Sequence, residues 1–151
     1  MNKSILIASL VLIGGCSTTY QAPSTDSQHF SGQHDSDKKA VIEKAKKILL
    51  MDGYQIQSAS NTEGYISTSY KNWKLSPEQA SCGSTMGIDY LKDNRTKTEV
   101  AINIIVDEET LSVRSNIKGE YKPGTVSQDI TLTCVSNGVI ESDIAEQIIS
   151  N

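Results

Sequence analysis

The spacing of apolar residues predicts a helix at each end of the main domain. From residue 38 apolar positions recur every three or four residues, with lysines between them, as in an amphipathic helix. The apolar positions of this first helix are Val41, Ile42, Ala45, Ile48 and Leu49. Ser36 or Asp37 is placed to cap its start, and Asp52-Gly53 to end it. We interpret the lysines as a solvated face, with a binding face as the alternative. The helical period returns at Ile140, Ile144, Ala145, Ile148 and Ile149.

Between the two helices the apolar period changes to two, which predicts short strands separated by turns. The strongest alternation is at 98–106, where every second residue is Thr, Val or Ile. We expect further strands at 54–58, 65–70, 87–92, 111–117 and 130–134, and a brief helix at 76–79. The order predicts an α+β fold, an antiparallel β-meander of about 4–6 strands with the N-terminal and C-terminal helices packed on one face.

A separate apolar run lies at residues 5–13, ahead of the domain. Nine positions are too few to cross a bilayer, because a spanning helix needs roughly 20 apolar residues. Lys3 precedes the run and Gly14-Gly15 follows it, which is the order of charge, apolar core and small residues in a secretory signal. Residues 12–16 read LIGGC, and this motif resembles the lipobox of bacterial lipoproteins.

The lipobox resemblance implies that residues 1–15 are a signal peptide and that Cys16 is the first residue of the mature chain. In that family the cysteine thiol carries a diacylglyceryl group and the new amino terminus is acylated, commonly with palmitate. Cys16 would then be a stable membrane anchor. In Gram-negative members a Ser at the next position, here Ser17, implies the outer membrane, with the domain in the periplasm. Gly14 is smaller than the residue usual there, and a secreted soluble protein with Cys16 as an ordinary thiol remains the alternative.

The segment 16–37 is rich in Ser, Thr, Gln and Asp and has no apolar period. Such composition is typical of chain that cannot offset its ordering entropy by burial, so we predict a flexible tether. His29 and His34 lie within it, next to Asp35. They could bind a metal weakly, but no closed set of ligands is visible, and we interpret them as solvated linker residues. We expect no metal and no cofactor. Residues 38–151 are then the single domain.

Charge gives little information about partners. The whole chain has 14 basic and 18 acidic side chains, and loss of Lys3 with the signal peptide makes the mature chain slightly more acidic. An acidic balance without a basic stripe argues against a nucleic-acid partner or anionic headgroups.

The chain has three cysteines, and the lipobox resemblance accounts for one of them. With Cys16 lipidated, an exported compartment favours a disulfide between Cys82 and Cys134. A free reactive thiol at either position is the alternative. The two are not in a CxxC arrangement, which argues against a redox pair.

The predicted domain contains no histidine, which removes Ser-His-Asp triads, Cys-His pairs and histidine-ligated zinc from consideration. Asp107, Glu108 and Glu109 are formal candidates for glycoside cleavage, but three adjacent acids in a turn are more typical of a solvated tip. We therefore predict no catalytic residues and no enzymatic activity.

Tyr70 and Trp73, with Lys71 and Lys74 beside them, form a candidate partner-binding patch, because exposed aromatic residues are enriched at protein interfaces. Packing of these aromatic residues against the core or a sheet edge is the alternative.

The layout of lipid anchor, tether, helix, strands and final helix resembles the small outer-membrane lipoproteins with a helix-sheet-helix domain, among them subunits of β-barrel assembly and lipopolysaccharide export machines. The resemblance implies an accessory, noncatalytic role as a binding or scaffolding module with an envelope protein partner. The alternatives are an inhibitor or immunity lipoprotein against a cell-wall enzyme, with residues 73–82 as a plug, and a carboxylate-dependent cell-wall enzyme.

Overall fold

The computed structural model describes residues 19–124 and 128–150. The predicted signal peptide and Cys16 lie outside the described residues. The elements are β1 (Tyr20–Gln21), β2 (Phe30–Gln33), α1 (Lys38–Met51), β3 (Ile56–Ser60), β4 (Tyr65–Thr68), β5 (Lys71–Asn72), β6 (Ala80–Ser81), β7 (Ser84–Thr85), β8 (Ile88–Asp89), the 3-10 helix η1 (Tyr90–Lys92), β9 (Thr96–Val106), β10 (Thr110–Tyr121), β11 (Ile130–Thr133), β12 (Val135–Ser136) and α2 (Val139–Ile149).

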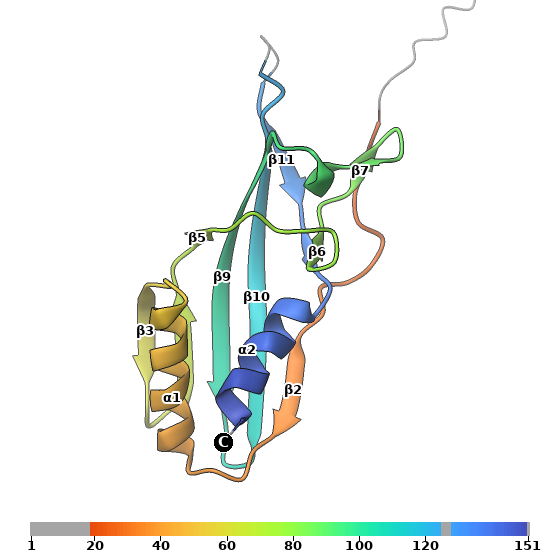
Figure 1. Cartoon of the computed structure of the whole chain (residues 1–151). Helices are drawn as coiled ribbons and strands as arrows, with labels where there is room; N and C mark the ends of the chain where they lie inside the picture. The colour runs from red at the N-terminus through yellow and green to blue at the C-terminus, as the bar shows by residue number, and fades with distance from the viewer. Residues whose placement is uncertain (1–18, 125–127, 151) are drawn as a thin grey trace, which may run out of the picture.

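An antiparallel sheet of seven strands forms the body of the protein, in the order β11-β10-β9-β4-β3, with β2 also paired to β10 and β5 to β9. Figure 1 shows α1 and α2 side by side on one face of this sheet. The predicted α+β class, the meander and the two helices on one face are therefore confirmed. The sheet is wider than predicted because it takes in the short strands β2 and β5.

The long β9-β10 hairpin organises the core. Its register places Val106 opposite Leu111 and Ile104 opposite Val113, and all four side chains are buried. Alternate residues of a strand point to opposite faces, so this apolar row meets the helices while the residues between them face away. The helices contribute Val41, Ile42, Ala45, Leu49, Ile140, Ile144, Ala145 and Ile148 to the same core.

Both helices begin and end largely as their sequences predict. The Asp37 side chain caps α1 by accepting a hydrogen bond from the Ala40 amide at 3.2 Å. Gly53 follows the helix with φ at +80°, a conformation that glycine adopts without steric cost. Neither helix among the described residues is long and apolar enough to cross a bilayer.

Two predicted elements in the middle of the chain are corrected by the structure. The helix predicted at 76–79 is wrong, because the segment makes only a single turn, with the Gln79 amide donating to the Ser76 carbonyl at 3.0 Å. The strand predicted at 87–92 is right only for Ile88–Asp89. It then becomes η1, where the Asp89 side chain caps the start by accepting from the Leu91 amide at 2.8 Å.

The prediction of a flexible tether is wrong where the segment forms the strands β1 and β2. β1 pairs with β7, and β2 pairs with β10, where Phe30 lies opposite Val113 and Gln33 opposite Thr110. Composition misled here because a strand of polar residues can be held by backbone pairing to a strand that is itself well packed. Phe30 adds an apolar contact with the core.

His34, expected to be solvated, is buried between β2 and the β9-β10 turn. Its Nδ1 lies 3.0 Å from the Ser36 carbonyl oxygen and its Nε2 lies 3.1 Å from the Asp107 carbonyl oxygen. Both partners are acceptors, so a neutral ring can donate to one of them and a protonated ring to both. His34 therefore links the segment after β2 to the β9-β10 turn. Among the described residues, no group of three or more His, Cys, Asp or Glu could hold a metal ion.

Cys82 and Cys134 form a disulfide, as predicted, with the two sulfur atoms 2.03 Å apart. The bond lies beside the small β6-β12 sheet and joins the middle of the chain to the segment that enters α2. It packs closely over β10, because a Cβ at Gly119 would lie 2.5 Å from the Cys134 Sγ.

Candidate binding surfaces

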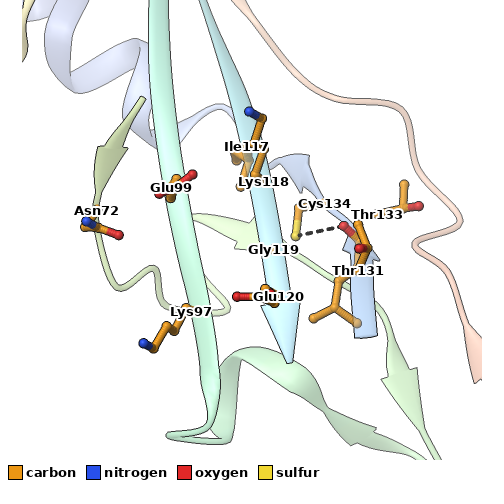
Figure 2. Close-up of a pocket in the computed structure, with 11 residues that line it drawn as sticks. Asn72, Lys97, Glu99, Ile117, Lys118, Gly119, Glu120, Thr131, Thr133 and Cys134 are labelled. Carbon is orange, nitrogen blue, oxygen red and sulfur yellow. Dashed lines mark hydrogen bonds between the residues drawn. The ribbon is translucent and has the colours of Figure 1, made fainter. Parts of the chain in front are cut away.

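A hollow of about 560 Å³ lies on the sheet face that the helices leave open. Figure 2 shows Lys97 and Glu99 of β9 beside Lys118 and Glu120 of β10. The register sets Glu99 opposite Lys118 and Lys97 opposite Glu120, so the charges balance across the strands. Opposite charges in cross-strand positions stabilise a sheet and leave no net field for a charged ligand. We interpret this hollow as a solvated sheet face.

The four residues of the predicted binding patch do not form one surface. Tyr70 is exposed on the open face, where the Lys118 Nζ lies 3.8 Å from the centre of its ring. Lys71 and Trp73 instead line a cleft on the helix side. Lys74 is exposed, and its Nζ donates to the Asn94 Oδ1. Strand alternation around β5 separates these neighbours in sequence, so the patch is split.

A recess on the helix side lies between α2 and β5. It has a volume of about 250 Å³ and is lined by Asp52, Tyr54, Lys71, Trp73, Ile140, Asp143, Ile144 and Gln147. The Lys71 Nζ lies 4.2 Å from the centre of the Tyr54 ring and 5.1 Å from that of Trp73. It also donates to the Asp52 carbonyl oxygen at 2.5 Å. Cation-π contacts and this hydrogen bond hold the wall of the cleft in place.

Tyr54 lies at the base of this cleft with its hydroxyl unsatisfied. The side chain is buried, and its Oη has no hydrogen-bond partner among the described residues. Burial raises the pKa of the phenol well above its usual value, and the negative charges of Asp52 and Glu141 raise it further. Tyr54 therefore stays neutral at physiological pH and is a polar group that the free protein does not use.

We expect Tyr54→Phe to stabilise the free protein by about 1 kcal/mol, because it removes a buried hydroxyl that makes no hydrogen bond. The folded state favours the neutral phenol, so the wild-type chain should also lose stability as the pH rises above about 10, where the unfolded phenol ionises. In Tyr54→Phe, the part of this high-pH loss of stability that comes from the Tyr54 phenol should be absent. Urea unfolding at pH 7 and pH 10.5 measures both effects, and a loss of stability at pH 7 would show that the hydroxyl has a partner.

The end of α1 carries two exposed apolar residues and adjoins the cleft along the chain. Leu50 is 57% exposed and Met51 is 86% exposed, and Met51 directly precedes Asp52, which lines the cleft. On the other side of the cleft, Asp143 and Gln147 of α2 are exposed and lie one helical turn apart. The recess and the adjoining end of α1 together present exposed apolar side chains, a partly buried Trp73 and polar groups, which is the composition of a protein interface.

Strand β3 is a free edge of the sheet, next to the end of α1 along the chain. Its sequence, IQSAS, has no charged residue and no proline. Charged residues and prolines on an edge strand usually prevent it from pairing with another chain. In β3 the feature of this kind is a register irregularity between Ile56 and Ser58. An unpaired edge of this kind can accept an extended segment of another protein.

Two further candidate sites predicted from the sequence are the acidic turn at 107–109 and the loop 73–82. Asp107, Glu108 and Glu109 lie exposed in the turn between β9 and β10. The loop considered as an inhibitor plug, 73–82, does not protrude, because Leu75, Ala80 and Cys82 are buried within it. The cleft could not be predicted from the sequence, because Tyr54 and Trp73 come together only in the folded protein.

No protein-family model and no curated protein sequence matches the chain.

Proposed function

We propose that the chain is a noncatalytic lipoprotein, anchored through Cys16, that serves as a binding or scaffolding module of a protein complex in the cell envelope. Its domain would stand in the periplasm if the source is Gram-negative. The partner is a protein segment that covers the cleft between α2 and β5. The observation that carries this proposal is the exposed pair Leu50 and Met51 beside a recess lined by Trp73 and Tyr54.

Apolar side chains at a helix end usually pack against the body of the protein or are replaced by polar ones. Two consecutive exposed ones beside an aromatic recess indicate a surface that a partner covers. Burial of a side chain such as that of Met51 contributes about 1.5–3 kcal/mol, which is about a tenfold gain in affinity or more. The exposed Asp143 and Gln147 supply polar groups that can fix the orientation of the segment.

We expect Met51→Lys to lower recovery of the partner from solubilised envelope about tenfold or more, because it places a charge in the exposed apolar pair at the end of α1. The matched control is Ile105→Lys, which replaces an apolar residue exposed on the open sheet face of β9. The measurement is quantitative mass spectrometry of proteins that copurify with each lipidated variant. Equal recovery with both variants would contradict docking at the cleft.

A further inference from the structure

The β7-β8 hairpin carries the most exposed apolar tip among the described residues outside the end of α1. Met86 is 79% exposed and Ile88 is 68% exposed, with Gly87 between them. The stretch 82–88 has no charged side chain. The tip could therefore leave water without desolvating an ionic group.

The backbone holds Met86 at the tip in an unfavourable conformation. Met86 has φ at +53° and Gly87 has φ at +77°, and Met86 is the one non-glycine residue at positive φ among those the structure describes. Glycine, asparagine and aspartate are the usual residues at such a turn position, because a larger side chain strains the backbone there. An apolar residue kept in a strained, exposed position favours a functional explanation.

The base of the hairpin is held firmly. The Thr85 Oγ1 and the Tyr90 hydroxyl are 2.6 Å apart, and the Tyr90 ring packs edge-on against Tyr20 and Tyr121. The Tyr20 hydroxyl also donates to the carbonyl oxygen of Cys82 at 3.1 Å, next to the disulfide. The tip is thus a fixed projection from a rigid base.

The pairing of β1 directs the chain toward this tip. Gln21 lies opposite Ser84 and Tyr20 lies opposite Thr85, so the chain approaches the tip when it is followed backward from Gln21 to Tyr20. Figure 1 shows that the described chain begins beside β7, at the end of the protein opposite to the β9-β10 turn. Cys16 is four residues before Tyr20, and four residues reach at most about 14 Å.

We propose that Met86 and Ile88 insert into the surface of the bilayer that holds the lipidated Cys16. This inference rests on the proposed lipid anchor, because the anchor brings the membrane within reach of β1. Insertion gives the domain a fixed orientation, with the turn at 107–109 pointing away from the bilayer. The lipid keeps the protein on the membrane, and the two apolar side chains fix the orientation of the domain. A weak interfacial contact can do this because the lipid anchor supplies most of the membrane affinity.

The test uses the full-length lipidated chain in vesicles of phosphatidylethanolamine and phosphatidylglycerol, part of which carry bromine on the acyl chains. Trp73→Phe removes the native tryptophan, and Ile88→Trp then introduces a single probe at the tip. The control probe is Ile105→Trp in the same background, since Ile105 is also an exposed apolar residue. We expect brominated lipid to quench the probe at 88 at least threefold more than the probe at 105. Adding Met86→Asp should reduce the quenching at 88 to the level of the control.

Sedimentation with the vesicles separates failure of the anchor from failure of the tip. A chain that sediments but shows equal quenching at both positions overturns the insertion of the hairpin and leaves the anchor intact. A chain that does not sediment overturns the anchor and the inference together. Equal quenching in vesicles, combined with a probe at 88 that is shielded in native envelope, would assign the tip to a protein partner and also overturn the inference.

Discussion

Replacement of Glu141 by alanine is expected to lower the free energy of unfolding by about 4 kcal/mol, because it leaves several buried donors without an acceptor. Glu141 is fully buried in the first turn of α2. Its Oε1 accepts from the Ser115 amide at 3.0 Å and from the Ser115 hydroxyl at 2.5 Å. Its Oε2 accepts from the Ser136 hydroxyl at 2.6 Å. The carboxylate therefore joins the sheet, the strand before α2 and the helix itself.

The position of Glu141 at the helix start adds to this effect. The N-cap of α2 is Gly138, which has no side chain to cap the helix, and a negative charge near the first turn offsets the positive end of the helix dipole. Glu141→Gln keeps one acceptor oxygen and the shape of the side chain, so we expect a smaller loss of about 2 kcal/mol. Glu146→Ala, at an exposed position of the same helix, should change stability by less than about 0.5 kcal/mol. Urea unfolding of the three variants measures the series, and equal effects of Glu141→Ala and Glu146→Ala would contradict it.

Loss of the disulfide is the second large effect. The bond joins residues 52 positions apart, and for a loop of this length the chain-entropy model gives a stabilisation of about 4 kcal/mol. We expect the double variant Cys82→Ala/Cys134→Ala to lose about this amount in urea unfolding at pH 7. The β6-β12 pairs and the hydrogen bond from Tyr20 to Cys82 lie beside the bond, so their order should fall with it.

Gly119→Ala provides an independent check of the disulfide site, because the added Cβ would lie 2.5 Å from the Cys134 Sγ. It should destabilise the oxidised protein and have a smaller effect in the double cysteine variant, where the sulfur atoms are gone. Gly53→Ala is the matched control, since a Cβ at Gly53 meets nothing within 4 Å, although its positive φ adds some strain there. A double cysteine variant as stable as the wild-type chain would contradict the assigned role of the bond.

Sequence patterns predicted the parts of the fold that have a strong period. α1, α2 and the β9-β10 hairpin follow from repeated apolar positions, because burial of one face is what stabilises each of them. β1 and β2 could not be predicted in this way, because polar strands such as FSGQ are held by pairing with residues about 80 positions away. The local composition of these strands does not indicate that pairing.

The candidate site was predictable only in part. Lys71 and Trp73 were identified from their type, and both do lie in the cleft, but the residues that complete it come from α2 and from the segment that follows α1. An acidic residue such as Glu141 is common in the first turn of a helix, so its position there is ordinary. Its burial follows from the hydroxyl groups of Ser115 and Ser136, which meet it only in three dimensions.

The most direct test of the central proposal, a lipid-anchored module that binds an envelope protein at the α2-β5 cleft, is photo-crosslinking in the native cell envelope. A photoreactive residue replaces Met51 at the end of α1, next to the cleft along the chain. In the control, the same photoreactive residue replaces Ile105. The account predicts one recurrent envelope protein joined to position 51, little at position 105, and loss of the product in a Cys16→Ser chain. A folded protein that gives no product at position 51, or the same product from both positions, would contradict it.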